Sequence, residues 1–516
     1  MPTFERGQPQ PHEGSAALAR LKWNTISGLV QALLSTGTIF FVYRYVIETV
    51  GLVDLGVWAL VGGAATAGSL GTLGLGAASV KFTAKHLASR QSAKANEAIV
   101  TAFFAVAASV GLIALLALWG LPSLLALAIE GRAETLLALD LLPWALLAFW
   151  FNAVGGVLLG GLDGWNRMDL RAVVVVLATA AYALVAVVCL PRVGIIGLVQ
   201  GQIAQGIVVM VAAWITLVRL SPSHSLLPRA FSFNALREML TYGATFQVIS
   251  VLQMLVEPAA KFLLTTWGGL ALTGVFELAN RLAFQVRSLL NSAYHPLFPL
   301  VADLHESDPD AIRDIYARAF QVVVFTVSVL FPAVLLMLPL ISVAWLGWFE
   351  PSFVLFAAVL CAAWFGNLAG TPAYYANAGT GDLRWNVVGH LLTAALLPLL
   401  AWTLGPALQG HGVVYGFAFA LLAGSLTIVA HFHVAHGIRL TDLLGRHDLV
   451  GAALSGGAVT ALVLLSTREL PQGPALWEML VLAVAGLCIL AIWALRHPQG
   501  QWLLSHSPLL SRKDSA

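Results

Sequence analysis

The sequence predicts an all-α fold: a polytopic membrane helical bundle of about 14 transmembrane helices, with two six-helix lobes in parallel pseudo-repeat plus two C-terminal helices. Composition is the first observation behind this prediction. Of the 516 residues, 59% are hydrophobic and only 10% are charged, whereas about a quarter of a soluble domain is charged. The other observations are a series of apolar runs about 20 residues long and the short polar segments between them. Together they exclude a soluble globular protein.

Apolar runs bounded by polar or Gly/Pro-rich breaks mark the individual helices, because about 20 residues are needed to cross the hydrocarbon core. The runs are too long and too evenly apolar for the alternating strands of a membrane barrel. In chain order, the predicted spans are 23–43, 55–80, 98–120, 141–162, 172–191, 194–218, 239–267, 272–301, 319–341, 353–378, 387–404, 413–435, 450–466 and 476–495. The loops between them are too short for an extramembrane domain.

The basic residues orient these spans. With the N-terminus in the cytoplasm, twenty of the 27 Lys and Arg residues fall on the cytoplasmic side. Only Arg44, Arg132, Arg192 and Arg468 fall on the other side. Such a bias follows the positive-inside rule and predicts an even number of spans with both termini in the cytoplasm.

An internal repeat divides the chain. The stretch from Gly51 to Leu60 resembles the stretch from Gly269 to Leu278 at an offset of 218, and the same shift carries Gly161 onto Gly379 and Gly194 onto Gly412. Six spans therefore repeat in parallel, with the substrate expected between the lobes. The predicted domains are an N-lobe (1–218), a cytoplasmic inter-lobe loop (219–238), a C-lobe (239–440) and a C-terminal pair of helices with a cytoplasmic tail (441–516).

Spans seven and eight, which meet at Trp267-Gly268-Gly269, carry five charges at membrane depth: Glu257, Lys261, Glu277, Arg281 and Arg287. A charge there costs several kcal/mol unless it is paired or faces a watery cavity. Depth along the helices lets Glu257 pair with Arg281 and Lys261 with Glu277. Each acid also precedes a base by four residues on its own helix. The cluster fits either a structural set of ion pairs or a functional site.

Arg287 is left without a predicted acidic partner. It lies about 21 Å below the outer end of its span and shares a helix face with Asn280 and Asn291. A guanidinium at this depth needs an anion or water, and its planar donors suit a diphosphate. We predict that these three residues, with Arg281 and Lys261, bind substrate.

Coupling to an ion gradient has two candidates in the same hairpin, Glu257 and Glu277. Glu257 is the deepest acid and precedes Pro258, which frees the carbonyl of Met254 either as a cation ligand or simply at a bend in the helix. No cluster of residues predicts a metal site.

The first lobe offers neutral polar groups instead of charges. Asn24, Ser27, Gln31, Ser35 and Thr38 recur every three or four residues along span one. This stripe fits two roles, contact with sugar hydroxyls or hydrogen bonding to a neighbouring helix. We include Asn24 and Gln31 among the candidate substrate-binding residues.

Several stretches carry a family resemblance. Residues 50–60 (VGLVDLGVWAL), 73–82 (LGLGAASVKF) and 158–167 (LLGGLDGWNR), together with 268–282 (GGLALTGVFELANRL) and the stretch from Pro296 to Leu304, resemble the polysaccharide-transporter (Wzx-like) branch of the multidrug/oligosaccharidyl-lipid/polysaccharide superfamily. The resemblance implies a flippase that moves undecaprenyl-diphosphate-linked oligosaccharide across a bacterial inner membrane, for O-antigen, capsule or exopolysaccharide. It also implies membrane lipids, a polysaccharide polymerase and a chain-length regulator as partners, with no cofactor and no nucleic acid.

Other functions remain as alternatives. A lipid II flippase of the murein type shares the fourteen-span count. A multidrug or cation antiporter should need a buried acid in the first lobe, yet spans one, three and five contain no Asp or Glu. An enzyme should show a large outer loop or clustered acids and bases, so we predict no catalytic residue. Cys189, Cys361 and Cys488 lie in apolar spans and predict neither a disulfide framework nor a Cys-rich metal site.

Overall fold

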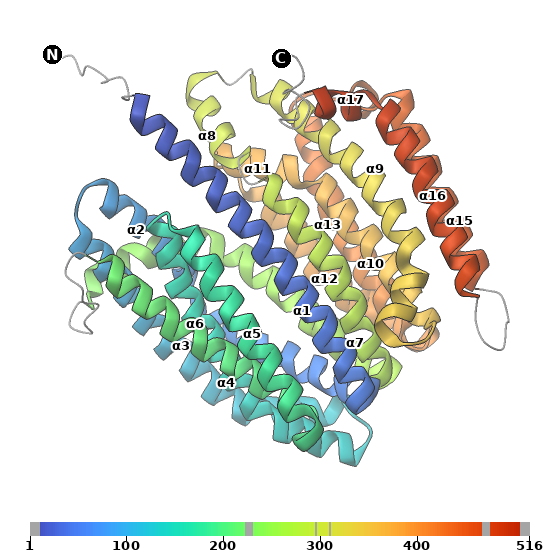
Figure 1. Cartoon of the computed structure of the whole chain (residues 1–516), viewed down its shortest axis with the longest axis horizontal. Helices are drawn as coiled ribbons and strands as arrows, with labels where there is room; N and C mark the ends of the chain where they lie inside the picture. The colour runs from blue at the N-terminus through green and yellow to red at the C-terminus, as the bar shows by residue number, and fades with distance from the viewer. Residues whose placement is uncertain (1–10, 222–230, 295–296, 309–310, 467–474, 506–516) are drawn as a thin grey trace. The chain divides into compact units, whose positions relative to one another are not determined.

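The computed structural model describes residues 11–221, 231–294, 297–308, 311–466 and 475–505, except for some side chains, chiefly those of residues 11–26, 242–250 and 289–293. The described residues form helices and no strand, which confirms the all-α prediction (Figure 1). Residues 222–230 of the predicted inter-lobe loop lie outside the described part of the chain.

Two helices of the first half, α1 and α7, each contain one predicted span and the first part of the next. In order they are α1 (Pro11–Thr66), the 3-10 helix η1 (Ala67–Thr72), α2 (Leu75–Ala88), α3 (Ser92–Ala128), α4 (Arg132–Gly164), α5 (Met168–Val193), α6 (Ile196–Leu220) and α7 (Phe233–Tyr294). The helices of the second half follow as α8 (Leu297–Ser307), α9 (Ala311–Leu346), α10 (Pro351–Ala369), α11 (Thr371–Thr380), α12 (Arg384–Ala407), α13 (His411–Ala435), α14 (Leu440–Leu443), α15 (Arg446–Ser466), α16 (Leu476–Arg496) and α17 (Pro498–Ser505).

Eleven helical segments of the described chain are long and apolar enough to cross a membrane. Two of them are interrupted by a glycine that leaves helical geometry, Gly51 (φ 84°) in α1 and Gly269 (φ 78°) in α7. Only glycine adopts such an angle at little cost, so the chain can turn there from one span into the next. Each of the two segments therefore accounts for two predicted spans. Helix α15, with 21 residues, coincides with predicted span thirteen but is not among the eleven.

Two predicted spans are interrupted by breaks in the helix within the described residues. Span two is a helix only to Thr66, followed by η1, two residues in left-handed conformation (Leu73 and Gly74) and α2. The glycine-rich sequence of this stretch weakens a continuous helix. Span ten is divided at Gly370 into α10 and α11, and residues 295 and 296 of span eight lie outside the described part of the chain.

The described residues cluster into two compact units. One comprises the described residues within Met1–Val50, Ala64–Ala126 and Thr135–Val248, and the other those within Gly51–Gly63, Leu127–Glu134 and Ile249–Ala516. Within the first unit α5 packs against α6, and within the second α12 packs against α13. The second unit includes a short part of α1, which the predicted lobe boundaries assign to the N-lobe. Those boundaries stay a prediction.

A reciprocal contact inside the second unit follows the predicted repeat. A Cβ atom at Gly56 would collide with the backbone carbonyl of Leu270, and one at Gly274 would collide with that of Leu52. Both glycines and both leucines are related by the same offset of 218 that relates Gly51 to Gly269. Gly194 (φ 62°) has a positive φ, as does Gly410 (φ 84°), two residues before the predicted counterpart Gly412.

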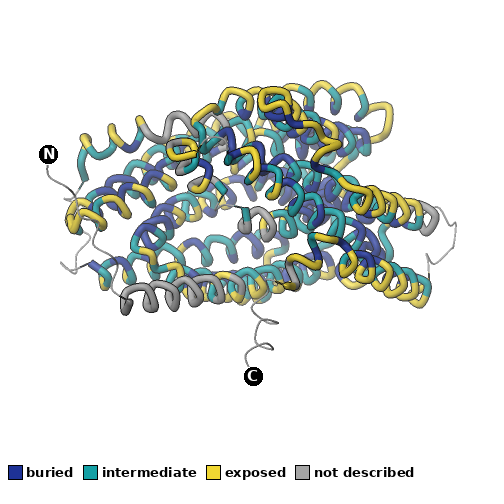
Figure 2. Tube along the Cα trace, turned by 90° about the horizontal axis from the view of Figure 1, so that it is seen from above, coloured by how far each residue is buried: buried dark blue, intermediate teal, exposed yellow. Residues whose placement is uncertain are grey.

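The helices are apolar on the outside as well as inside. Buried and exposed residues alternate along most of the chain (Figure 2). Exposed positions carry large apolar side chains, such as Leu115 and Trp119 of α3, which are 67% and 88% exposed. Apolar surface of this extent suits a hydrocarbon solvent and not water. The protein is therefore a multi-pass membrane protein.

Candidate functional site

The candidate site lies in the second unit, where α7 passes through Pro258 and the glycine turn at Gly269. Proline within a helix removes one backbone hydrogen bond, and the break at Gly269 places Lys261 and Glu277 on consecutive helical segments close enough to touch. The prediction that two helices meet at residues 267–269 is confirmed. This hairpin positions all five charged residues that the sequence singled out.

Four of those charges form a continuous chain of ion pairs. The Nζ atom of Lys261 lies 2.7 Å from Oε1 of Glu257 and 2.7 Å from Oε2 of Glu277, and Arg281 also pairs with Glu277. The predicted pair of Lys261 and Glu277 is thus confirmed. Glu257 contacts Lys261, the base four residues ahead, and its pairing with Arg281 stays a prediction.

Burial distinguishes the members of this network. Lys261 and Glu277 are 5% and 2% exposed, whereas 43% of the Glu257 side chain is exposed. The aliphatic part of Lys261 packs against the backbone of Gly63, where a Cβ atom would lie 3.1 Å from Lys261 Cδ. Two acids and two bases sum to zero charge, so the network is internally compensated. Glu257 and Arg281, with 43% and 35% of their side chains exposed, present surface beyond it.

Arg287 has a different environment, formed by polar and aromatic groups of α10. Its Nε and Nη2 atoms both donate to Oδ1 of Asn367, at 3.2 and 3.1 Å. Its guanidinium carbon lies 4.5 Å from the ring centroid of Trp364, a cation–π geometry. Asn280 accepts a hydrogen bond from the indole of the same Trp364. The prediction that Asn280 and Arg287 share a face is borne out by this common contact.

The orientation of Asn367 is itself fixed. Its Nδ2 donates to Oγ of Ser425 at 2.7 Å, and Ser425 donates onward to the carbonyl of Leu421. Asn367 must therefore present its oxygen to Arg287. A guanidinium has five N–H donors, and Asn367 uses two of them. The remaining donors and the charge are held in place without an acidic partner among the described residues.

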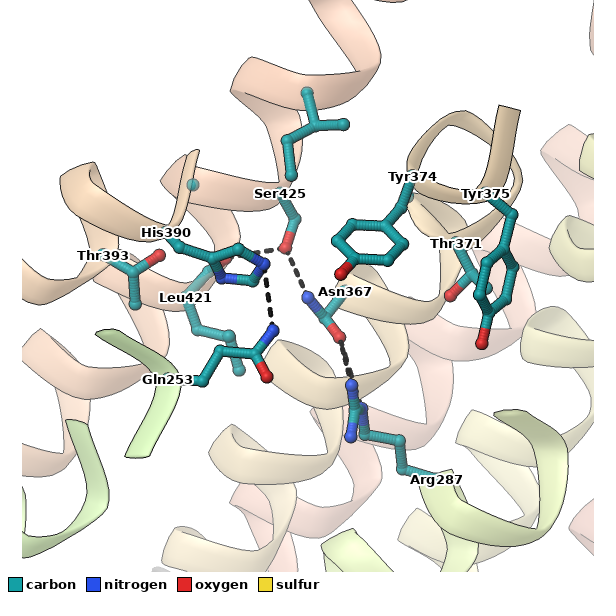
Figure 3. Close-up of a pocket in the computed structure, with 13 residues that line it drawn as sticks. Gln253, Arg287, Asn367, Thr371, Tyr374, Tyr375, His390, Thr393, Leu421 and Ser425 are labelled. Carbon is teal, nitrogen blue, oxygen red and sulfur yellow. Dashed lines mark hydrogen bonds between the residues drawn. The ribbon is translucent and has the colours of Figure 1, made fainter. Parts of the chain in front are cut away.

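A cavity of about 260 Å³ adjoins this arginine (Figure 3). Gln253 and Arg287 reach it from α7, Tyr374 and Tyr375 from α11, and His390 from α12. His390 Nε2 lies 2.9 Å from the amide nitrogen of Gln253. None of the described lining residues is acidic. Arg287 is the fixed cation of a pocket that otherwise offers hydroxyl, amide and imidazole groups.

A second cavity, of about 350 Å³, adjoins the first and shares Arg287, Gln253 and His390 with it. Its other walls are mostly apolar, including Phe284, Trp364 and Phe417. It also contains one acid among its described lining residues, Glu257. Arg287 thus lines both cavities, and Glu257 lies on the wall of the second.

The remaining predicted site residues are less informative. Gln31 lies half-buried in α1, in the first unit. Asn24 belongs to α1 and Asn291 to α7, but both side chains fall outside the described part of the structure. No sequence pattern singles out Gln253, Trp364 or Ser425, which also line or support the cavities.

Comparison with known proteins identifies relatives of this architecture. A family described as "Polysaccharide biosynthesis protein" matches residues 84–345. No curated protein matches the sequence.

Solved structures share the fold. The lipid II flippase MurJ, in an inward closed conformation, superposes with a TM-score of 0.66 at 11% identity, covering 92% of this chain and 98% of that chain. An inward-facing MATE family transporter of the MOP superfamily gives 0.56 at 15% identity, covering 83% and 99%. A MATE transporter from Vibrio cholerae gives 0.58 at 13% identity, also covering 83% and 99%. At such identities the likeness shows the fold alone.

Proposed function

The chain belongs to the polysaccharide biosynthesis protein family, whose model matches residues 84–345. We propose that it flips undecaprenyl-diphosphate-linked oligosaccharide repeat units across the bacterial inner membrane. The flipped units feed the assembly of a surface polysaccharide such as O-antigen, capsule or exopolysaccharide. Membrane lipids surround the protein, and a polysaccharide polymerase and a chain-length regulator act next. Both termini face the cytoplasm, as the distribution of Lys and Arg predicts.

The observation that carries this proposal is the environment of the Arg287 guanidinium. Its guanidinium is held by Asn367 and Trp364 beside a polar cavity with no acid among its described lining residues. A diphosphate that leaves water loses its hydration, and a fixed cation in a low-dielectric site offsets much of that loss. The N–H groups of the Arg287 guanidinium that do not bond to Asn367 can bind two oxygens of one phosphate. Arg287 is the proposed anchor of the diphosphate, with Arg281, Asn280 and Asn291 further along the same hairpin.

Complementation of a strain that lacks its own flippase tests the anchor. Arg287→Lys keeps the charge but loses the fork, so surface polysaccharide should fall partially. Arg287→Ala should reduce surface polysaccharide about tenfold or more, because it removes one or two charge-assisted hydrogen bonds to the phosphate. The matched control is Arg192→Ala, an exposed arginine in the last turn of α5, which should behave as wild type. Membrane abundance and thermal stability are measured for each variant. Full polysaccharide from a normally folded Arg287→Ala protein contradicts the anchor.

A lipid II flippase is the second candidate, supported by the likeness to MurJ over 92% of this chain. Two rescue experiments distinguish the two substrates. Growth of cells depleted of their lipid II flippase supports the murein precursor as substrate. Restored surface polysaccharide in the strain that lacks its oligosaccharide flippase supports the oligosaccharide. A MATE-type antiporter is the third candidate and predicts drug resistance on expression.

Energy coupling is proposed to involve Glu257, the half-exposed acid of the network. Glu277 also stays a candidate, although Lys261 and Arg281 already occupy its carboxylate. Transport by the Glu257→Gln variant in proteoliposomes, with unchanged dependence on proton and sodium gradients, would remove Glu257 from the coupling mechanism.

A further inference from the structure

The two cavities that meet at Arg287 differ in chemistry at their far ends. One is lined by hydroxyl donors such as the side chains of Thr371 and Tyr374 and has no acid among its described lining residues (Figure 3). The other is lined by aromatic rings and contains the carboxylate of Glu257. A negatively charged group is therefore favoured at the first end and disfavoured at the second. A ligand with one anionic and one neutral part would bind in a single orientation.

Glu257 has the geometry of a fixed hydrogen-bond acceptor. Lys261 Nζ contacts its Oε1 atom at 2.7 Å, and a carboxylate has about four acceptor positions on two oxygens. Acceptor capacity therefore remains on the half-exposed side chain. Lys261 is in turn held by the buried Glu277. The ion-pair network holds Glu257 in position at the cavity wall.

The rings around this end complete the set of groups that recognise a sugar. Trp364 packs edge-on with Phe284 and Phe417, with ring centroids 5.8 and 6.1 Å apart. Aromatic rings pack against the C–H face of a pyranose. The hydroxyls of the sugar need acceptors such as the carboxylate of Glu257 and the side-chain amide oxygen of Gln253. A polyprenyl chain suits this end less well, because it would desolvate the Glu257 carboxylate without offering it a hydrogen bond.

We propose that the cavity beside Glu257 binds the sugar directly attached to the phosphate. Glu257 accepts a hydrogen bond from a ring hydroxyl while Arg287 holds the phosphate, and Lys261, Glu277 and Arg281 are positioning residues for Glu257. This inference rests on the proposed function and extends it, because it assigns the cavity that binds the sugar and the residue that hydrogen-bonds its hydroxyl groups.

Binding of small probes to the purified full-length protein tests the assignment. Isothermal titration calorimetry compares inorganic phosphate with the 1-phosphates of glucose, galactose and N-acetylglucosamine. At least one hexose 1-phosphate should bind about tenfold more tightly than phosphate, the effect of one hydrogen bond to a charged acceptor. In Glu257→Gln this ratio should fall towards one, because a neutral amide is a weaker acceptor than a carboxylate.

Glu48→Gln is the matched control. Glu48 also pairs with a base four residues away, Arg44, but both side chains are about half exposed and neither lines either cavity. In Glu48→Gln, the ratio of the affinity for hexose 1-phosphate to the affinity for inorganic phosphate should equal that of wild type. Gln253→Leu is a second test variant, which should also lower the ratio if Glu257→Gln fails to fold. Elution profile and melting temperature report folding for all variants.

The outcomes separate the two proposals. Phosphate binding that depends on Arg287, with no preference for any hexose 1-phosphate, overturns the sugar assignment and leaves the anchor intact. A preference that survives in Glu257→Gln and Gln253→Leu also overturns the assignment. If neither phosphate nor any hexose 1-phosphate binds, both the anchor and the sugar site are wrong.

Discussion

The buried ion-pair network of α7 yields the sharpest stability prediction. Replacing Glu277 by Gln removes the charge that Lys261 and Arg281 share, and Glu277 and Lys261 are almost fully buried. Lys261 would keep only the half-exposed Glu257. Breaking a buried pair by removing one partner typically costs about 3–5 kcal/mol, because an uncompensated charge is left behind. We expect Glu277→Gln to lose about 3 kcal/mol of unfolding free energy.

The same reasoning predicts strong coupling between the two partners. Lys261→Met alone should also be destabilising, since it leaves Glu257 and Glu277 as neighbouring acids. The double variant removes both charges, and its loss should be smaller than the sum of the two single losses by at least about 1 kcal/mol. Unfolding in mixed detergent micelles, followed by tryptophan fluorescence, gives the three free energies.

An exposed pair provides the reference. Arg44 and Glu48 are also four residues apart on one helix, with side chains 44% and 51% exposed. Exposed pairs contribute about 0–1 kcal/mol, so Glu48→Gln should change stability little. If Glu277→Gln costs no more than Glu48→Gln, or if the single losses simply add, the network does not stabilise the hairpin through buried charge compensation.

Three further predictions follow from the described geometry. Gly56→Ala and Gly274→Ala should each lower folded yield, because the new methyl group collides with the carbonyl of Leu270 or Leu52; Gly28→Ala, where nothing lies within 4 Å, should fold as wild type in the same gel-filtration assay. Burial, opposed by Asp448, lowers the pKa of His497 at the α16–α17 junction. The unfolded chain then binds more protons than the fold below about pH 6.5, so stability should fall as pH drops through that range; a melting temperature of His497→Gln with the same pH profile as wild type would contradict this. Reporter tags at either terminus and next to Arg219 should lie in the cytoplasm, and a tag near Trp348 in the periplasm; one reversed tag refutes the predicted topology.

The sequence alone determined the features that depend on local order along the chain. Apolar run lengths identified the membrane class and most of the spans, because each span must satisfy its own backbone within lipid. The breaks at Gly51 and Gly269 were visible as repeated glycine motifs. The pairing of Lys261 with Glu277 followed from depth along two helices joined by a short turn, since 1.5 Å per residue fixes both heights.

The tertiary structure decided which faces of those helices meet. In lipid, residues that face a neighbour and residues that face acyl chains are both apolar, so the sequence pattern does not fix helix rotation. The contacts of Arg287 with Asn367 and Trp364 join positions about 80 residues apart, and no local pattern predicts them. Glycine content alone did not indicate that span two would break into η1 and α2. The polar cavity beside Arg287 and the placement of Glu257 on the wall of its neighbour arise only when α7, α10, α11, α12 and α13 pack together.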